Sequence, residues 1–99
     1  MLNIIKEREG DKLTVALEGR LDTITSPDLE KSLSESLPGV TELVMDFEKL
    51  DYISSAGLRV LLATQKIMNR QGSMKLCHVR EAIMEILEVT GFTDILTIE

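Results

Sequence analysis

Two adjacent serines, Ser54 and Ser55, stand where an apolar strand segment gives way to a helix-forming segment. In an open α/β sheet, the crevice beyond the carboxyl ends of the strands is the usual functional edge. Because Ser is among the residues that lead at the helix N-cap, one of the two is expected to cap the helix. A phosphate on either serine would be tolerated there, since free N–H groups and the helix dipole favour an anion. The pair therefore indicates a helix cap, a phosphorylation site, or one residue that serves as both.

Two further positions belong to the same constellation. Gly57 follows the serines closely, and its missing side chain is expected to leave access to them for a modifying enzyme. Asp22 follows the second apolar strand segment and precedes the first helical one. By itself Asp22 is typical of a turn or cap residue, since Asp side chains bind nearby backbone N–H groups.

Signatures of catalysis are absent from the sequence. The single Cys77 and the single His78 are neighbours, so on a strand they are expected to point to opposite faces and not to pair as nucleophile and base. No phosphate-binding loop, nucleophile elbow or zinc-protease motif occurs, and Cys and His show no metal-ligand spacing. We therefore expect a protein that is not an enzyme and that has no catalytic residues, cofactor or metal.

Composition narrows the class of protein further. The 99 residues carry a net charge of −6 and are 43% hydrophobic, which predicts one folded domain over residues 1–99. The acidic pI of about 4.8 disfavours direct binding to nucleic acid. Apolar runs are too short to span a bilayer, and the N-terminal residues do not resemble a signal peptide. With one cysteine and no export signal, a cytoplasmic location is expected, without membrane attachment.

The elements that must position these residues follow from hydrophobic periodicity and turn signals. Ser26 is expected to cap the first helix, which ends at Pro38-Gly39. Strands are predicted over residues 2–8, 13–18, 43–47, 74–79 and 95–98, and helices over residues 26–37, 56–70 and 80–90. Residues 48–53 are expected to form a loop. The order β-β-α-β-α-β-α-β predicts an α/β fold whose sheet of about five strands is mixed, being largely parallel after a first hairpin.

Three segments in this order resemble the STAS domain of bacterial anti-sigma factor antagonists. They are EGRLD over Glu18–Asp22, SSAGLRVLL over Ser54–Leu62 and LEVTGF over Leu87–Phe92. The resemblance covers the whole chain, and it implies the STAS fold, a small mixed sheet with helices packed on it. It also implies partner switching: the unphosphorylated protein binds an anti-sigma factor that is a serine kinase, and the sigma factor is released.

The resemblance implies particular roles for particular residues. The kinase uses ATP to phosphorylate Ser55, which aligns with the family's phosphoserine two residues before Gly57. Ser54 is the second choice of phosphorylation site, because this chain has a serine where many members have Asp. A PP2C-type phosphatase restores the hydroxyl, and the free protein is expected to be a monomer. The expected partner-binding residues are Asp22, Ser54, Ser55, Ala56, Gly57 and Arg59.

Three other functions are open to the same sequence. The chain could be a STAS scaffold within a larger signalling assembly, or a STAS module that binds a nucleotide or small molecule. A serine hydrolase that uses Ser55 is the third, but His78 is the only histidine that could activate the hydroxyl.

Overall fold

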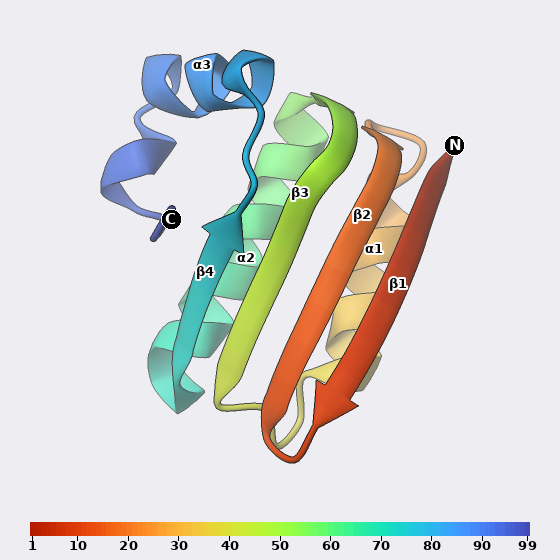
Figure 1. Ribbon diagram of the computed structural model, residues 1–99, viewed down its shortest axis with the longest axis vertical. Helices are drawn as coiled ribbons and strands as arrows, with labels where there is room; N and C mark the ends of the chain where they lie inside the picture. The colour runs from red at the N-terminus through yellow and green to blue at the C-terminus, as the bar shows by residue number, and fades with distance from the viewer.

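A four-stranded sheet in the order β1-β2-β3-β4 forms one layer of the computed structural model, which describes residues 1–99 (Figure 1). The strands are β1 (Leu2–Glu9), β2 (Lys12–Leu21), β3 (Glu42–Ile53) and β4 (Ser73–Cys77). β1 and β2 form the predicted antiparallel hairpin, while β2, β3 and β4 are parallel to one another. The predicted mixed sheet is therefore confirmed.

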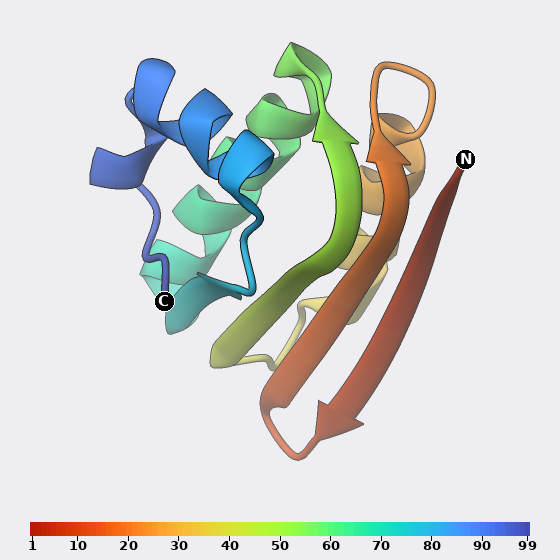
Figure 2. The ribbon, with the colours of Figure 1, turned by 45° about the horizontal axis from the view of Figure 1, so that its top comes forward.

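Two helices, α1 (Ser26–Ser36) and α2 (Ser55–Gln71), cover one face of this sheet (Figures 1 and 2). Alternate strand residues supply the apolar layer beneath them, because successive side chains of a strand point to opposite faces. The buried strand residues of this layer include Leu13, Val15, Leu17, Leu43, Met45 and Phe47. The other face of the sheet carries no helix from α1 or α2. None of the helices combines the length and the apolar character needed to cross a membrane.

The third helix, α3 (Glu81–Val89), follows β4 and lies at that edge of the sheet, where a short 3-10 turn, η1 (Phe92–Asp94), continues the chain (Figure 1). The strand predicted over residues 95–98 is wrong. Only a single bridge joins Ile98 to Leu76, so the sheet has four strands and not five. After η1 the chain still turns at Ile95 and Leu96, so only Ile98 comes into strand pairing with Leu76.

The predicted loop over residues 48–53 is also wrong, because β3 continues to Ile53. Phe47, Leu50 and Ile53 are buried at a three-residue spacing, which does not resemble the alternation of an ordinary strand. The pairing of β2 with β3 shifts register twice along this stretch. Such irregularities re-aim side chains, so a strand can bury every third residue while keeping its hydrogen bonds.

Candidate functional site

Ser54 and Ser55 occupy different positions at the start of α2. Ser54 is the N-cap: its backbone is extended, and its Oγ accepts the Gly57 N–H across 3.4 Å. Its own backbone N–H donates to the Leu21 carbonyl across 2.9 Å, which attaches the start of α2 to the end of β2. Ser54 is half-buried, whereas Ser55 is the first helical residue and is exposed. The predicted cap is therefore Ser54, and the Ser55 hydroxyl faces solvent.

Gly57 lies in the interior, beneath these serines. It is buried, and a Cβ added to it would come within 2.8 Å of Leu21 Cγ and 2.9 Å of Ile53 Cγ1. The prediction that its missing side chain leaves access at the surface is therefore wrong. The glycine instead lets the first turn of α2 approach the ends of β2 and β3 closely.

Asp22 organises the loop between β2 and α1. Its Oδ1 accepts the backbone N–H groups of Ile24 and Thr25, each across 3.0 Å, and the Thr25 hydroxyl across 3.2 Å. The hydrogen bond from the Thr25 backbone N–H holds the pKa of Asp22 below its usual value. Partial burial alone would raise this pKa. The pKa is lowered further by the Thr25 hydroxyl, the Ile24 N–H and the positive charge of Arg20. The turn role predicted for Asp22 is confirmed.

The cap predicted for α1 is wrong. Thr25 occupies the N-cap position, while Ser26 is the first helical residue. The Ser26 hydroxyl donates backward to the Asp22 carbonyl, so it serves the preceding loop and not the free N–H groups of the helix. α1 has no side-chain cap, and the Asp22 carboxylate instead accepts two N–H groups of the loop before the helix.

The Asp22 loop and the start of α2 meet at one edge of the sheet. A shallow groove of about 180 Å³ runs between the first turns of α1 and α2, and its lining includes Thr23, Ala56 and Arg59. Arg59 lies one helical turn after Ser55, so both belong to the same side of α2. The structure thus gathers five of the predicted residues around this edge, namely Asp22, Ser54, Ser55, Ala56 and Arg59.

No role was predicted from the sequence for three residues of this edge. Ile24, at the tip of the Asp22 loop, is 84% exposed. The Arg20 guanidinium lies over the Tyr52 ring, 4.3 Å from its centroid, and both side chains are exposed. The sequence did contain a signal for Ile24: it is an isoleucine between a turn residue and a helix start, and it belongs to no strand or helix pattern of apolar residues. The Arg20–Tyr52 pair depends on the registry of β2 with β3, which no local pattern contains.

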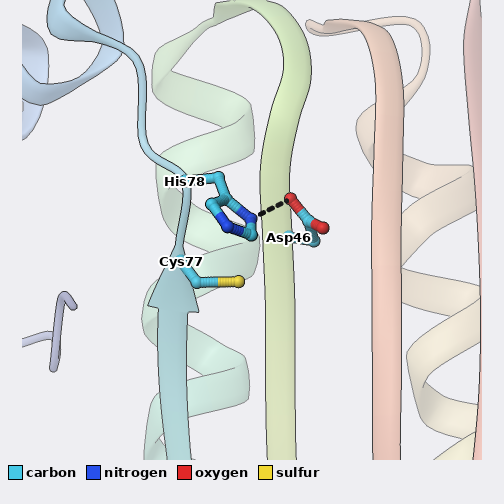
Figure 3. Close-up of side chains that lie close together, drawn as sticks. All are labelled: Asp46, Cys77 and His78. Carbon is cyan, nitrogen blue, oxygen red and sulfur yellow. Dashed lines mark hydrogen bonds and ion pairs between the residues drawn. The ribbon is translucent and has the colours of Figure 1, made fainter.

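Cys77 and His78 do not point to opposite faces, contrary to the prediction. β4 ends at Cys77, and His78 has a φ of 55°, so the chain leaves the strand geometry between them. Both side chains point from β4 toward β3, and His78 Nδ1 lies 3.1 Å from Asp46 Oδ1 (Figure 3). Burial, with help from the negative charges of Asp46 and Glu99, raises the pKa of the Cys77 thiol.

Comparison with known proteins gives one consistent family. Residues 3–99 match the sequence profile of the STAS domain. BtrV of Bordetella bronchiseptica, named as a candidate anti-sigma factor antagonist, is 36% identical over 85 residues, covering 84% of this chain and 73% of that protein. The anti-sigma-B factor antagonist of Bacillus subtilis is 30% identical over 95 residues, covering 95% of this chain and 86% of that protein.

The fold is shared with solved structures as well. The Bacillus cell fate determinant SpoIIAA in its phosphorylated form superimposes with a TM-score of 0.77 at 17% identity, covering 98% of this chain and 91% of that one. The family profile spans nearly every residue, and the sheet and helices superimpose on the solved fold. This chain belongs to the STAS domain family.

Proposed function

We propose that this chain is an anti-sigma factor antagonist, a single domain over residues 1–99 that acts in the cytoplasm by occupying a partner protein. In its unphosphorylated form it binds a serine-kinase anti-sigma factor, and the sigma factor is released. The names of its relatives support this function. The observation that carries the mechanism is the exposed Ser55 hydroxyl at the head of α2, beside a serine that is engaged as the cap.

Ser55 is the better acceptor of the two serines. Its side chain is exposed, while Ser54 is half-buried and holds the Gly57 N–H. In the transfer step, Ser55 Oγ bonds to the γ-phosphorus of ATP, the bond from that phosphorus to ADP breaks, and the hydroxyl proton passes to a base of the kinase. This chain contributes only the acceptor, so it catalyses no reaction and needs no cofactor. A PP2C-type phosphatase would restore the hydroxyl.

Electrostatics supply the switch. A phosphate on Ser55 carries about −1.5 to −2 charges at pH 7. In the free protein it would lie at the positive end of the α2 dipole, with Arg59 one turn away, so the fold need not change. In the complex the same dianion must lose water against a surface that fits a hydroxyl, and the negative charge of Asp22 borders the site. A penalty of about 3 kcal/mol weakens binding roughly 100-fold.

The partner-binding surface in this proposal consists of Asp22, Ser54, Ser55, Ala56 and Arg59, with Gly57 packed beneath it. We include Ile24 in this surface, because its large apolar side chain is 84% exposed in the Asp22 loop and its burial against a partner would add to the binding energy. Apolar anchors of this kind contribute most of the binding energy in protein interfaces when they enter a pocket. The free protein is proposed to be a monomer that contacts neither nucleic acid nor membrane.

The direct test uses the serine-kinase anti-sigma factor encoded in the same genome. With ATP, wild type and Ser54→Ala should incorporate phosphate, whereas Ser55→Ala should not. Phosphate on Ser55→Ala at the wild-type rate would reject Ser55 as the site. Binding is then measured for the phosphorylated and unphosphorylated proteins, and roughly 100-fold weaker binding of the phosphoprotein is expected. Equal affinity would reject the charge mechanism.

A further inference from the structure

A cluster of three potential metal ligands lies away from the start of α2. Asp46, Cys77 and His78 each offer one ligand atom, and these atoms lie within 4.8 Å of one another (Figure 3). Asp46 belongs to the middle of β3, and Cys77 and His78 stand at the end of β4. The cluster plays no part in the proposed partner switch.

Strand pairing brings the cluster together. In the parallel ladder of β3 and β4, Asp46 is the direct partner of Cys77. Their strand neighbours Met45 and Leu76 are fully buried in the core, so Asp46 and Cys77 point to the open face of the sheet. Two ligand types far apart in sequence thus lie side by side on one surface.

The backbone at His78 adds the third ligand. A residue that continued β4 would point to the opposite face, but His78 has a φ of 55° in the left-handed region. Non-glycine residues adopt that region rarely, although His is among the types enriched there. The turn directs the imidazole back over the open face, where its Nδ1 comes within 3.1 Å of Asp46 Oδ1.

The spacing of the ligand atoms is close to that of a tetrahedral site. Zinc bonds of about 2.0–2.3 Å place neighbouring ligand atoms roughly 3.3–3.7 Å apart. The Asp46–His78 pair is already near this separation at 3.1 Å. No pair of the three ligand atoms is more than 4.8 Å apart, so the longer separations need to shorten by only about 1 Å to match a zinc site. The His78 side chain is 60% exposed, which leaves water access to a fourth position.

The charges around the cluster favour a cation. The Glu48 carboxylate lies 4.0 Å from His78 Nδ1, which adds a second negative group beside Asp46. The Lys75 ammonium on β4 pairs with Glu99 across 3.1 Å, so its positive charge is offset. A divalent ion would therefore enter a negative surface whose donors are sulfur, nitrogen and oxygen together.

We propose that Asp46, Cys77 and His78 bind one zinc ion, with water as the fourth ligand. The mixed donor set selects zinc or a similar transition metal, since magnesium and calcium prefer oxygen ligands alone. On binding, the Cys77 S–H bond breaks, its proton leaves to solvent, and the sulfur bonds to the metal. His78 binds through the Nδ1 lone pair and keeps its proton on Nε2. The ion would join the end of β4 to the middle of β3.

The test is a titration of the intact, reduced protein without an affinity tag. Calorimetry with Zn²⁺ should show one ion per chain, and Mg²⁺ should give no binding. Co²⁺, as a spectroscopic substitute, should produce a thiolate-to-cobalt charge-transfer band that disappears in Cys77→Ser. Absence of Zn²⁺ binding, or a Co²⁺ spectrum without the thiolate band, would overturn the proposal and leave the cluster as an Asp46–His78 hydrogen bond.

Three conservative variants test whether these side chains bind the metal. Asp46→Asn and Cys77→Ser keep the shapes of the side chains, and His78→Asn keeps a residue that tolerates the left-handed backbone. Because loss of even an outer-shell partner costs about 10–100-fold in metal affinity, each should weaken Zn²⁺ binding at least tenfold. Glu88→Gln, an exposed carboxylate on α3, is the matched control and should bind as wild type. Metal-free circular dichroism confirms that each variant is folded, and unchanged affinity in the three ligand variants would refute the site.

Discussion

Replacing Gly57 with alanine measures how closely the start of α2 packs on the sheet. In an unpacked helix this change is stabilising by about 1 kcal/mol, because alanine has the higher helix propensity. Here the new Cβ would lie 2.8 Å from Leu21 Cγ and 2.9 Å from Ile53 Cγ1, both atoms of fully buried side chains. Overpacking a core costs about 1–3 kcal/mol, and two close neighbours place this site in the upper part of that range. We therefore expect a net destabilisation of about 1 kcal/mol or more.

The assay is equilibrium unfolding in urea. With a slope of about 1 kcal/mol/M, as suits a small domain, the midpoint of Gly57→Ala should fall by about 1 M or more. Pairing the change with Leu21→Ala removes one of the close contacts, so Gly57→Ala should cost less in that background. A Gly57→Ala protein as stable as wild type, or more stable, would refute the close packing on which the placement of Ser55 depends.

Three other changes give distinct outcomes. Ser54→Ala should lower the free energy of unfolding by about 0.5 kcal/mol, which is at the low end for N-caps because the Ser54–Gly57 hydrogen bond is 3.4 Å long. Ser55→Ala should not destabilise the protein. If thermal unfolding showed Ser55→Ala to be the less stable variant, the assignment of the cap would be contradicted. Gln71→Leu should lower the free energy of unfolding, measured in urea, by about 1–3 kcal/mol. The Gln71 Nε2 donates to the carbonyls of Leu37 and Val40, which follow α1, across 2.8 and 2.6 Å, and the variant loses both bonds. An unchanged free energy of unfolding would argue against these bonds. Asp22→Asn should lower stability at neutral pH. Folding lowers the pKa of Asp22, so its charge stabilises the fold above the unfolded-state pKa of about 3.9, and this stabilisation is lost as the pH falls through the folded-state pKa. The urea midpoints of wild type and Asp22→Asn should therefore converge in acid. A difference between the midpoints that stays constant with pH would show that the charge is not involved.

Much of the fold was predictable from local patterns. Alternating residues such as Leu13, Val15 and Leu17 predicted β2, and the turn at Gly10 predicted the hairpin that β1 and β2 form. The helices were found within a residue or two of their bounds, since apolar residues recur at helical spacing between cap and glycine signals. The second half of β3 was missed because its register shifts against β2 replace the two-residue period.

The candidate site was predictable in part. Ser54, Ser55 and Asp22 stand next to recognisable strand and helix boundaries, so their types and positions indicated a cap, a turn or a modified hydroxyl. Which serine caps α2 was not predictable, because the answer depends on where β3 ends and how Ser54 bonds to Leu21 on β2. Little in the sequence indicated that Ile24 is exposed, because its exposure depends on how the neighbouring elements pack in the folded protein.

The sequence by itself determined the order of the elements as far as α3 and the serine pair at a helix start, because these follow from patterns among residues close along the chain. The alternation of strands and helices also indicated the parallel part of the sheet. Tertiary structure alone decided that Gly57 faces the core, that Ser55 and not Ser54 is exposed, and that Asp46 meets Cys77 and His78. These outcomes depend on strand register and on one left-handed residue. A shift of one residue in register would turn Asp46 or Cys77 to the other face of the sheet, and no local pattern specifies that choice.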